Sequence, residues 1–194
     1  RALLDAAGEL LVEGGFGAMT FAAIGERAGY SRSMVTARFG NREGLIGALI
    51  EKMVGTWRED DGTAEDEAEA PTGLDALLDP LATIGAKSGR DVEDARVLNA
   101  LLFEAPGGDR VLQEPLRRFQ RDLIADLVRV IERGQTDGSI RVEVDPADEA
   151  AFVVTVLRGI GYQWLLDPEQ TDPARALAHA RSAIDRQVTS ETTV

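Results

Sequence analysis

A group of side chains suited to binding phosphate and base edges lies between Thr20 and Arg42. The group shares hydroxyl, amide or guanidinium donors and comprises Thr20, Ser31, Arg32, Ser33, Thr36, Arg38, Asn41 and Arg42. Such donors bond to phosphate oxygens and to the acceptors that base pairs expose in the DNA grooves. The sequence offers no nucleophile with a neighbouring base, no phosphate-cradling glycine loop and no metal-ligand spacing. Nucleic-acid binding is therefore the chemistry that this stretch favours over catalysis.

The elements that must position these side chains are two short helices within residues 20–39. Thr20 is a suitable N-cap for the first helix, and Ser31 for the second. Gly29 stands where a helix C-terminus needs a left-handed residue. The small Gly25 lets the two helices approach closely. The pattern predicts a helix-turn-helix, and the alternative is a pair of packed helices in some other all-α protein.

A third helix after this pair adds a place for phosphate. Asn41 is its expected cap, and Arg42 lies in its first turn. A cation and free backbone N–H groups then lie beside the second helix, where an anion binds well. Arg32, Ser33 and Thr36 are therefore expected at base edges. Phosphate contacts are expected from Thr20, Arg38, Asn41 and Arg42.

Residues 1–49 resemble the DNA-binding domain of the TetR family of bacterial transcriptional regulators. The most specific motifs are GGFGAMT, IGERAGYS and RFGNREGL, in that order and spacing. The sequence departs from the family at Thr36, where a tyrosine usually touches the DNA backbone. It also has Ser33 where glycine is common and Arg38 where histidine is common.

The resemblance implies an all-α protein of about nine helices. It divides the chain into a three-helix DNA-binding domain at 1–49, whose connecting helix continues to about 58, and a helical regulatory and dimerisation domain at 50–194. It implies a regulator that binds double-stranded operator DNA as a homodimer, with a repressor released by a small effector as the first interpretation. The alternatives are an activator, or a helical interaction protein that binds no effector.

Composition supports this division. The 194 residues contain no cysteine and one histidine, which excludes disulfides, thiolate sites and multi-histidine metal sites. The net charge is −13, but residues 1–58 hold seven Lys/Arg against six Asp/Glu. The acidity therefore lies outside the DNA-binding part, and the acidic body should repel DNA. No cofactor is expected, and a cytoplasmic location is the simplest interpretation. The first helix begins at Arg1, which predicts that a few residues precede it.

The remaining chain reads as helices separated by breaks. The first helix should span 1–13 and end at Gly14-Gly15. An acidic segment at 59–72 lacks large apolar residues and is expected to be a mobile loop. Further helices are expected at 74–87, 92–104 and 109–133, with Gly134 and Gly138 stopping the last.

Two C-terminal helices, at 146–166 and 173–188, are expected to form the dimer interface. Asp145 and Asp172, each followed by a proline, are their expected caps. From residue 150 to 166 the only charge is Arg158. This apolar segment is short for a membrane span, and a central arginine would be costly inside a bilayer. A helix apolar on nearly all sides is otherwise buried, here between its own core and a partner subunit. Gly159 and Gly161 would allow a close approach.

The effector site is implied by the resemblance, with a small apolar or amphipathic ligand. Its expected lining comprises Phe103, Phe119, Phe152, Arg158, Tyr162, Gln163 and Trp164. Ordinary core packing explains the aromatic residues equally well. The partner of Arg158 is either an internal carboxylate or an acidic effector. His179 is expected to pack or cap at the dimer interface rather than bind a metal.

Overall fold

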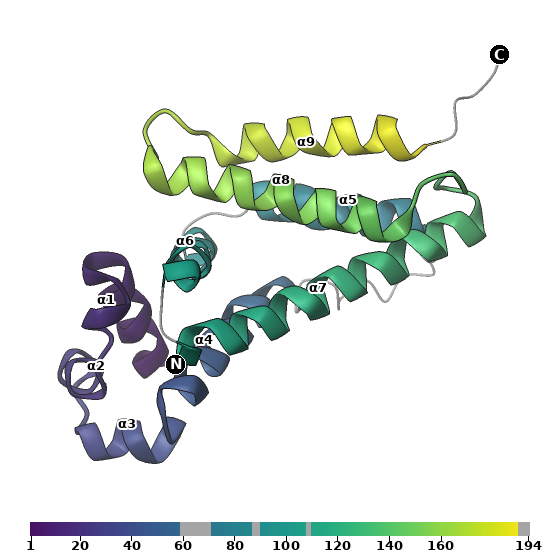
Figure 1. The fold of residues 1–194 in the computed structure, drawn as a ribbon. Helices are drawn as coiled ribbons and strands as arrows, with labels where there is room; N and C mark the ends of the chain where they lie inside the picture. The colour runs from purple at the N-terminus through teal and green to yellow at the C-terminus, as the bar shows by residue number, and fades with distance from the viewer. Residues whose placement is uncertain (59–70, 87–89, 108–109, 190–194) are drawn as a thin grey trace. The chain divides into compact units, whose positions relative to one another are not determined.

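The computed structural model describes residues 1–58, 71–86, 90–107 and 110–189. Within these residues the chain forms nine α-helices and a short 3-10 helix, with no strand (Figure 1). The prediction of an all-α fold with about nine helices is confirmed. The helices are α1 (Ala2–Ala18), α2 (Phe21–Ala28), α3 (Arg32–Phe39), α4 (Arg42–Arg58), α5 (Gly73–Ala86), α6 (Arg90–Glu104), η2 (Ala105–Gly107), α7 (Arg110–Asp137), α8 (Pro146–Leu166) and α9 (Pro173–Val188).

The helices form two compact units. The first holds α1 to α4, α6, η2 and the beginning of α7, and the second holds α5, the rest of α7, α8 and α9. This division differs from the predicted boundary at residue 49, because α6 packs on α1. A Cβ on Gly8 would lie only 3.0 Å from a methyl group of Val97. The functional boundary at 49 stays a prediction.

The first unit has a continuous apolar core. Val35 of α3 and Ile24 of α2 are fully buried against residues of α1, α4 and α6. Phe16 packs at the edge of this core. Helix α3 is therefore held from behind by its own apolar side.

Helix α1 does not end at Gly14-Gly15, where the sequence predicted its end. The chain breaks at Gly15, with φ 71° and ψ −177°, and then resumes helical geometry to Ala18. The left-handed φ is one that glycine adopts without strain. The predicted stop is thus a kink, since Met19 is anchored in the core and the chain must reach α2 from there.

The second unit is built on α5, α8 and α9 together with the later turns of α7. Its core contains Leu77, Ile131, Ala150, Leu177 and Ile184 among other buried side chains. The Asp145 and Asp172 side chains cap α8 and α9, each before a proline in the first turn, as predicted.

Helix α7 runs past Gly134, so the predicted stop there is wrong. A Cβ on Gly73 would overlap the Gly134 backbone, and one on Gly134 would come within 2.5 Å of Ile140. Gly134 is thus a crossing point inside the helix, and the end comes at Asp137, before Gly138 with φ 81°. Tertiary packing overrides the low helix propensity of glycine here.

Several predictions concern residues that are not described. The acidic segment at 59–72 lies outside the described residues apart from Pro71 and Thr72, as do 87–89 and the tail after Thr189. Among the described helices, none combines the length and apolar character needed to cross a bilayer.

Candidate nucleic-acid interface

The helix-turn-helix is fixed by side-chain caps and one close approach. The Thr20 hydroxyl accepts a hydrogen bond from the Ala23 amide at 3.1 Å, and Gly29 ends α2 with φ 76°. A Cβ on Gly25 would lie 2.7 Å from the Tyr30 carbonyl oxygen, so only glycine permits this turn. The predicted roles of these residues in the turn are confirmed.

The predicted base-edge residues all lie exposed on α3. Arg32, Ser33 and Thr36 project from a helix whose Val35 is completely buried. The hydroxyls have internal partners, because Ser33 pairs with the Ser31 hydroxyl at 2.8 Å and Thr36 donates to the Arg32 carbonyl at 3.0 Å. Each hydroxyl oxygen retains further hydrogen-bonding capacity toward a ligand. The Ser31 hydroxyl also caps α3 by accepting from the Met34 amide.

Two more of the predicted contacts lie in the last turn of α3 and just after it. The Arg38 guanidinium in that turn lies 5.6 Å from the centroid of the Phe39 ring and, within the described residues, forms no ion pair with Glu43. Asn41 caps α4 by accepting a hydrogen bond from the Gly44 amide at 2.9 Å. Both side chains are exposed, as a phosphate contact requires.

Arg42 has an internal role that the sequence did not predict. It is half-buried, donates to the Phe16 carbonyl oxygen at 2.8 Å, and its guanidinium lies 4.1 Å from the centre of the Phe16 ring. The Phe16 amide in turn donates to Glu104 at the end of α6, at 2.8 Å. The peptide after the Gly15 kink is thus held by α4 and α6. The phosphate contact of Arg42 stays a prediction.

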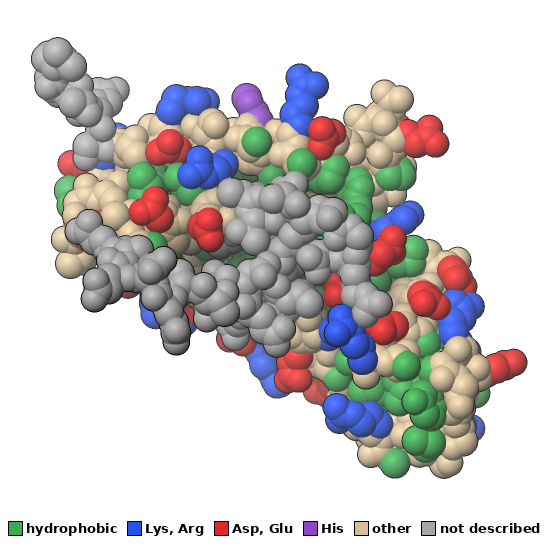
Figure 2. Space-filling view, turned by 180° about the vertical axis from the view of Figure 1, so that it is seen from behind, with side chains coloured by type: hydrophobic (Ala, Val, Ile, Leu, Met, Phe, Trp, Pro, Cys, Tyr) green, Lys and Arg blue, Asp and Glu red, His purple; other side chains and the backbone are tan. Residues whose placement is uncertain are grey.

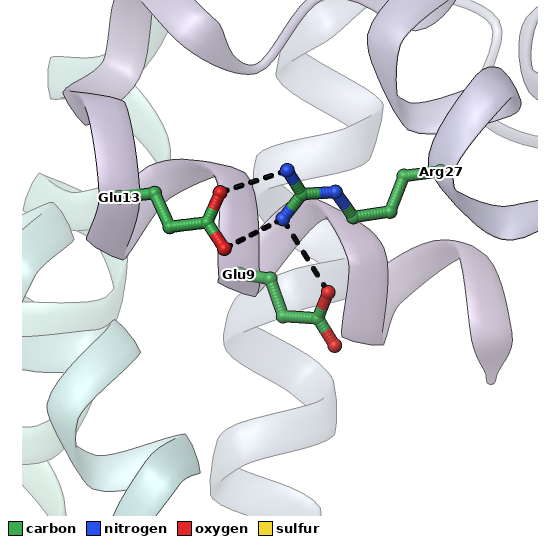
Figure 3. Close-up of polar contacts among 3 residues, drawn as sticks. All are labelled: Glu9, Glu13 and Arg27. Atoms are coloured by element: carbon green, nitrogen blue, oxygen red, sulfur yellow. Dashed lines mark hydrogen bonds and ion pairs between the residues drawn. The ribbon is translucent and has the colours of Figure 1, made fainter.

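A second unpredicted contact joins α2 to α1. Arg27 forms a bidentate ion pair with Glu13, with N–O distances of 2.8 and 2.7 Å, and also lies 3.5 Å from a carboxylate oxygen of Glu9 (Figure 3). The hydrogen bond from Arg27 lowers the pKa of Glu13 and raises that of Arg27. The pair is solvent-exposed, so it fixes orientation more than it adds stability.

Behind the interface, a partly buried cation joins three helices. Lys52 of α4 pairs with Asp5 of α1 at 2.9 Å and with Asp94 of α6 at 2.6 Å. Burial opposes the charge on Lys52, but the two carboxylates outweigh it and raise its pKa. The cluster borders a cavity of ≈ 350 Å³ between these helices. It anchors α4, which follows α3 directly.

The predicted effector-lining residues are divided between the two units. Phe103 and Phe119 belong to the first, and Arg158, Tyr162 and the other α8 residues to the second. Of the α8 group, Phe152, Tyr162 and Gln163 are exposed on the single chain, whereas Trp164 is half-buried. Burial lowers the pKa of Arg158 to about 10. The effector pocket itself stays a prediction.

The single histidine does not belong to a metal site of the described residues. His179 is exposed on α9 and is seen on the surface in Figure 2. No group of three or more His, Asp or Glu side chains among the described residues is arranged to hold a metal ion. Its expected place at a dimer interface stays a prediction.

The fold and this interface define an all-helical protein with an N-terminal helix-turn-helix. Residues 3–49 match the model of bacterial regulatory proteins of the tetR family, and residues 83–189 match that of the BetI-type transcriptional repressor C-terminal domain. The chain therefore belongs to the TetR family of transcriptional regulators. Members of this family bind operator DNA as dimers.

Solved structures support the same fold. A putative TetR-family transcriptional regulator from Rhodococcus sp. shares 24% identity over 97% of each chain, with a TM-score of 0.80. The SmeT–triclosan complex shares 23% identity over 100% of this chain and 92% of that one, with a TM-score of 0.77. FadR from Bacillus subtilis, in complex with stearoyl-CoA, shares 16% identity over 96% and 98%, with a TM-score of 0.74. No curated protein matches the sequence significantly.

Proposed function

We propose that this chain is a dimeric repressor that binds a palindromic operator and is released by a small apolar or amphipathic effector. The observation that carries the proposal is α3, which is buried along Val35 and presents Arg32, Ser33 and Thr36 to solvent. A helix so held can enter the major groove as a rigid element. This function places the protein in the cytoplasm, where the operator lies.

The DNA contacts divide into two kinds. Arg32, Ser33 and Thr36 lie on the exposed side of α3 and are assigned to base edges. Four residues at the ends of α2, α3 and α4 are assigned to phosphates, and they are Thr20, Arg38, Asn41 and Arg42. Because Arg42 is already bonded to Phe16, its phosphate contact uses only the guanidinium N–H groups that remain.

The dimer is supported by a stripe of exposed residues on α8. Their spacing alternates between three and four residues, as in a helix that packs along a partner helix, and they are Phe152, Thr155, Gly159, Tyr162 and Leu166. Tyr162 is 49% exposed and Leu166 70% exposed on the single chain. A Cβ on Gly159 would meet no atom within 4 Å. This surface suits a second copy of α8.

The effector is supported by analogy with similar folds. One neighbour is a complex with triclosan and another a complex with stearoyl-CoA. NalD from Pseudomonas aeruginosa, 20% identical over 98% of this chain and 96% of that one with a TM-score of 0.73, is described as a repressor of a multidrug efflux pump. An effector could bind better to a dimer whose two DNA-binding domains are too far apart for one operator. Such an effector would shift the population away from the DNA-bound state.

The proposal is tested by selecting bound sequences from random DNA with the purified protein. We expect a palindrome whose half-sites lie about 34–36 Å apart, one turn of DNA. Binding to it should weaken steeply with salt, because each neutralised phosphate releases a counterion. Failure to enrich any sequence, with protein that is folded and dimeric, would contradict the proposal.

The recovered operator then provides the assay for effectors. Apolar and amphipathic compounds are screened for loss of operator binding at fixed salt. A compound that releases the protein should, by linkage, bind the free protein more tightly than the operator-bound protein. Equal affinity for both forms would show that release has another cause.

A further inference from the structure

The exposed side of α3 carries two neighbouring apolar side chains. Val35 is fully buried, and at about 100° per residue Ser33 and Ala37 lie about 160° from it, while Met34 and Thr36 lie about 100° from it. All four are exposed. Met34, which is 52% exposed, lies three residues before Ala37 and so on the same side of the helix. Met34 and Ala37 together form a short apolar strip along one flank of the exposed side.

Two polar side chains beside this strip form hydrogen bonds within the helix and its cap. Ser33 bonds to Ser31, and Thr36 bonds to the Arg32 carbonyl. Met34 and Ala37 can offer a base edge only van der Waals contact. In the major groove the C5-methyl group of thymine is the apolar feature that distinguishes base pairs. The thioether chain of methionine is unbranched and adapts to such a surface.

We infer that Met34, supported by Ala37, reads thymine methyl groups in each half-site and so determines part of the sequence preference. The inference rests on the proposed function, because it concerns the same helix in the same groove. It adds apolar readout at one or two thymines to the polar contacts of Arg32. Neither Met34 nor Ala37 has a side-chain N–H or O–H group to donate to a base edge.

The test removes single methyl groups from the operator. Each thymine of a half-site is replaced in turn by deoxyuridine, which differs only at C5, and affinities are measured for the wild type and for Met34→Ala. At one or two positions we expect the wild type to lose about three- to fivefold in affinity, as the burial of one methyl group predicts. At those same positions Met34→Ala should change less than twofold.

Two further variants keep the test decisive. Met34→Gln retains the length of the side chain and should likewise lose the response to deoxyuridine. Val142→Ala changes another exposed apolar residue, 74% exposed in the other unit, and should respond as the wild type does. Equal responses of wild type and Met34→Ala at every thymine would overturn the inference. Failure of the wild type to enrich any operator would instead contradict the proposed function.

Discussion

The outward sides of α3 and α8 both expose large apolar side chains, but they differ in the charges around them. On α3, Met34 shares a short helix with two exposed cations, Arg32 and Arg38. On α8, the exposed residues from 151 to 166 carry no charge. An apolar strip among cations suits a polyanion with methyl groups in its groove, whereas an uncharged heptad stripe suits a copy of itself. Exposure alone marks both surfaces for a partner, and the surrounding charge indicates which.

The contacts that hold the two helices in place also differ in charge. Helix α4, next to α3, is joined to α1 and α6 by the buried Lys52 cluster. Helix α8 packs on α9 through apolar side chains, and Gln187 of α9 donates a hydrogen bond to the buried Glu149. Charged residues thus lie both on the exposed side of α3 and in the contacts that hold the neighbouring helix α4. The comparison predicts that charge changes in the two regions have opposite consequences.

The largest effect is expected from adding a charge to the α8 stripe. Gly159→Glu should leave the single chain folded, since a Cβ there meets nothing within 4 Å and glycine is a poor helix former. In the dimer it would place like charges against each other. Sedimentation equilibrium should show monomers. Operator affinity should fall about 100-fold or more, because binding of one subunit no longer brings a second subunit to the other half-site.

The matched control for this variant is Ala147→Glu, on the exposed first turn of α8 outside the stripe. It adds the same charge and should leave both dimer mass and operator affinity unchanged. A dimeric Gly159→Glu protein with normal operator affinity would remove α8 from the interface.

The next effect concerns the charge behind α3. Lys52→Met would leave Asp94, which is only 3% exposed, without its cation. Breaking a buried pair from one side costs about 3 kcal/mol, and denaturant unfolding should show a loss of this order. Because the pKa of Lys52 is raised, its contribution is present below the ordinary value of 10.5 and is lost only at higher pH. The loss should therefore be constant between pH 6 and 9.

The double variant Lys52→Met with Asp94→Leu controls for simple loss of packing. Replacing both charges by apolar groups should recover much of the lost stability. If the double variant is as unstable as Lys52→Met alone, the buried charge on Asp94 is not the cause.

A smaller effect separates the two kinds of arginine near α3. Arg32→Ala should alter the selected sequence and lower affinity about tenfold, with the free energy of unfolding unchanged. Arg42→Ala should weaken binding to all sequences, lower the salt slope and also destabilise the first unit, because it removes the support of Phe16. Selection, salt titration and thermal unfolding on both variants measure this difference. Indistinguishable profiles would contradict the two assignments.

Local signals in the sequence predicted most of the fold. The caps at Thr20, Ser31, Asp145 and Asp172 are confirmed, because a cap depends on residues three positions away at most. Gly134 failed as a stop signal, because its backbone packs against Gly73, which lies far along the chain. Propensity carries no information on such a crossing.

The candidate site shows the same difference between local signals and contacts that are distant in the chain. The exposed face of α3 was predictable from helical spacing alone, including Arg32, Ser33 and Thr36. The link from Arg42 through Phe16 to Glu104 was not, because it joins three elements across 88 residues and depends on the kink at Gly15. The exposure of Met34 was not predicted, since it depends on how α3 packs.

The smallest effect tests the single buried carboxyl group of α8. Glu149 accepts a hydrogen bond from Gln187 through one oxygen, while the other is buried without a hydrogen-bond partner. Burial raises the pKa of Glu149 above its ordinary value of 4.5. Its contribution to stability is therefore complete below pH 4.5 and is lost as the pH rises through the raised value. Above that range the ionised group opposes folding.

Glu149→Gln should thus match the wild type in stability near pH 4 and exceed it at pH 7.5, by roughly 1 kcal/mol, because the buried carboxyl group ionises there while the amide stays neutral. Denaturant unfolding at both pH values and at one protein concentration measures the difference. Glu143→Gln, an exposed carboxyl of the same unit, should show no such pH-dependent gain. A loss of stability at pH 7.5 would mean that the α8 region, like the scaffold of α3, depends on a buried charge, and the contrast between them would fail.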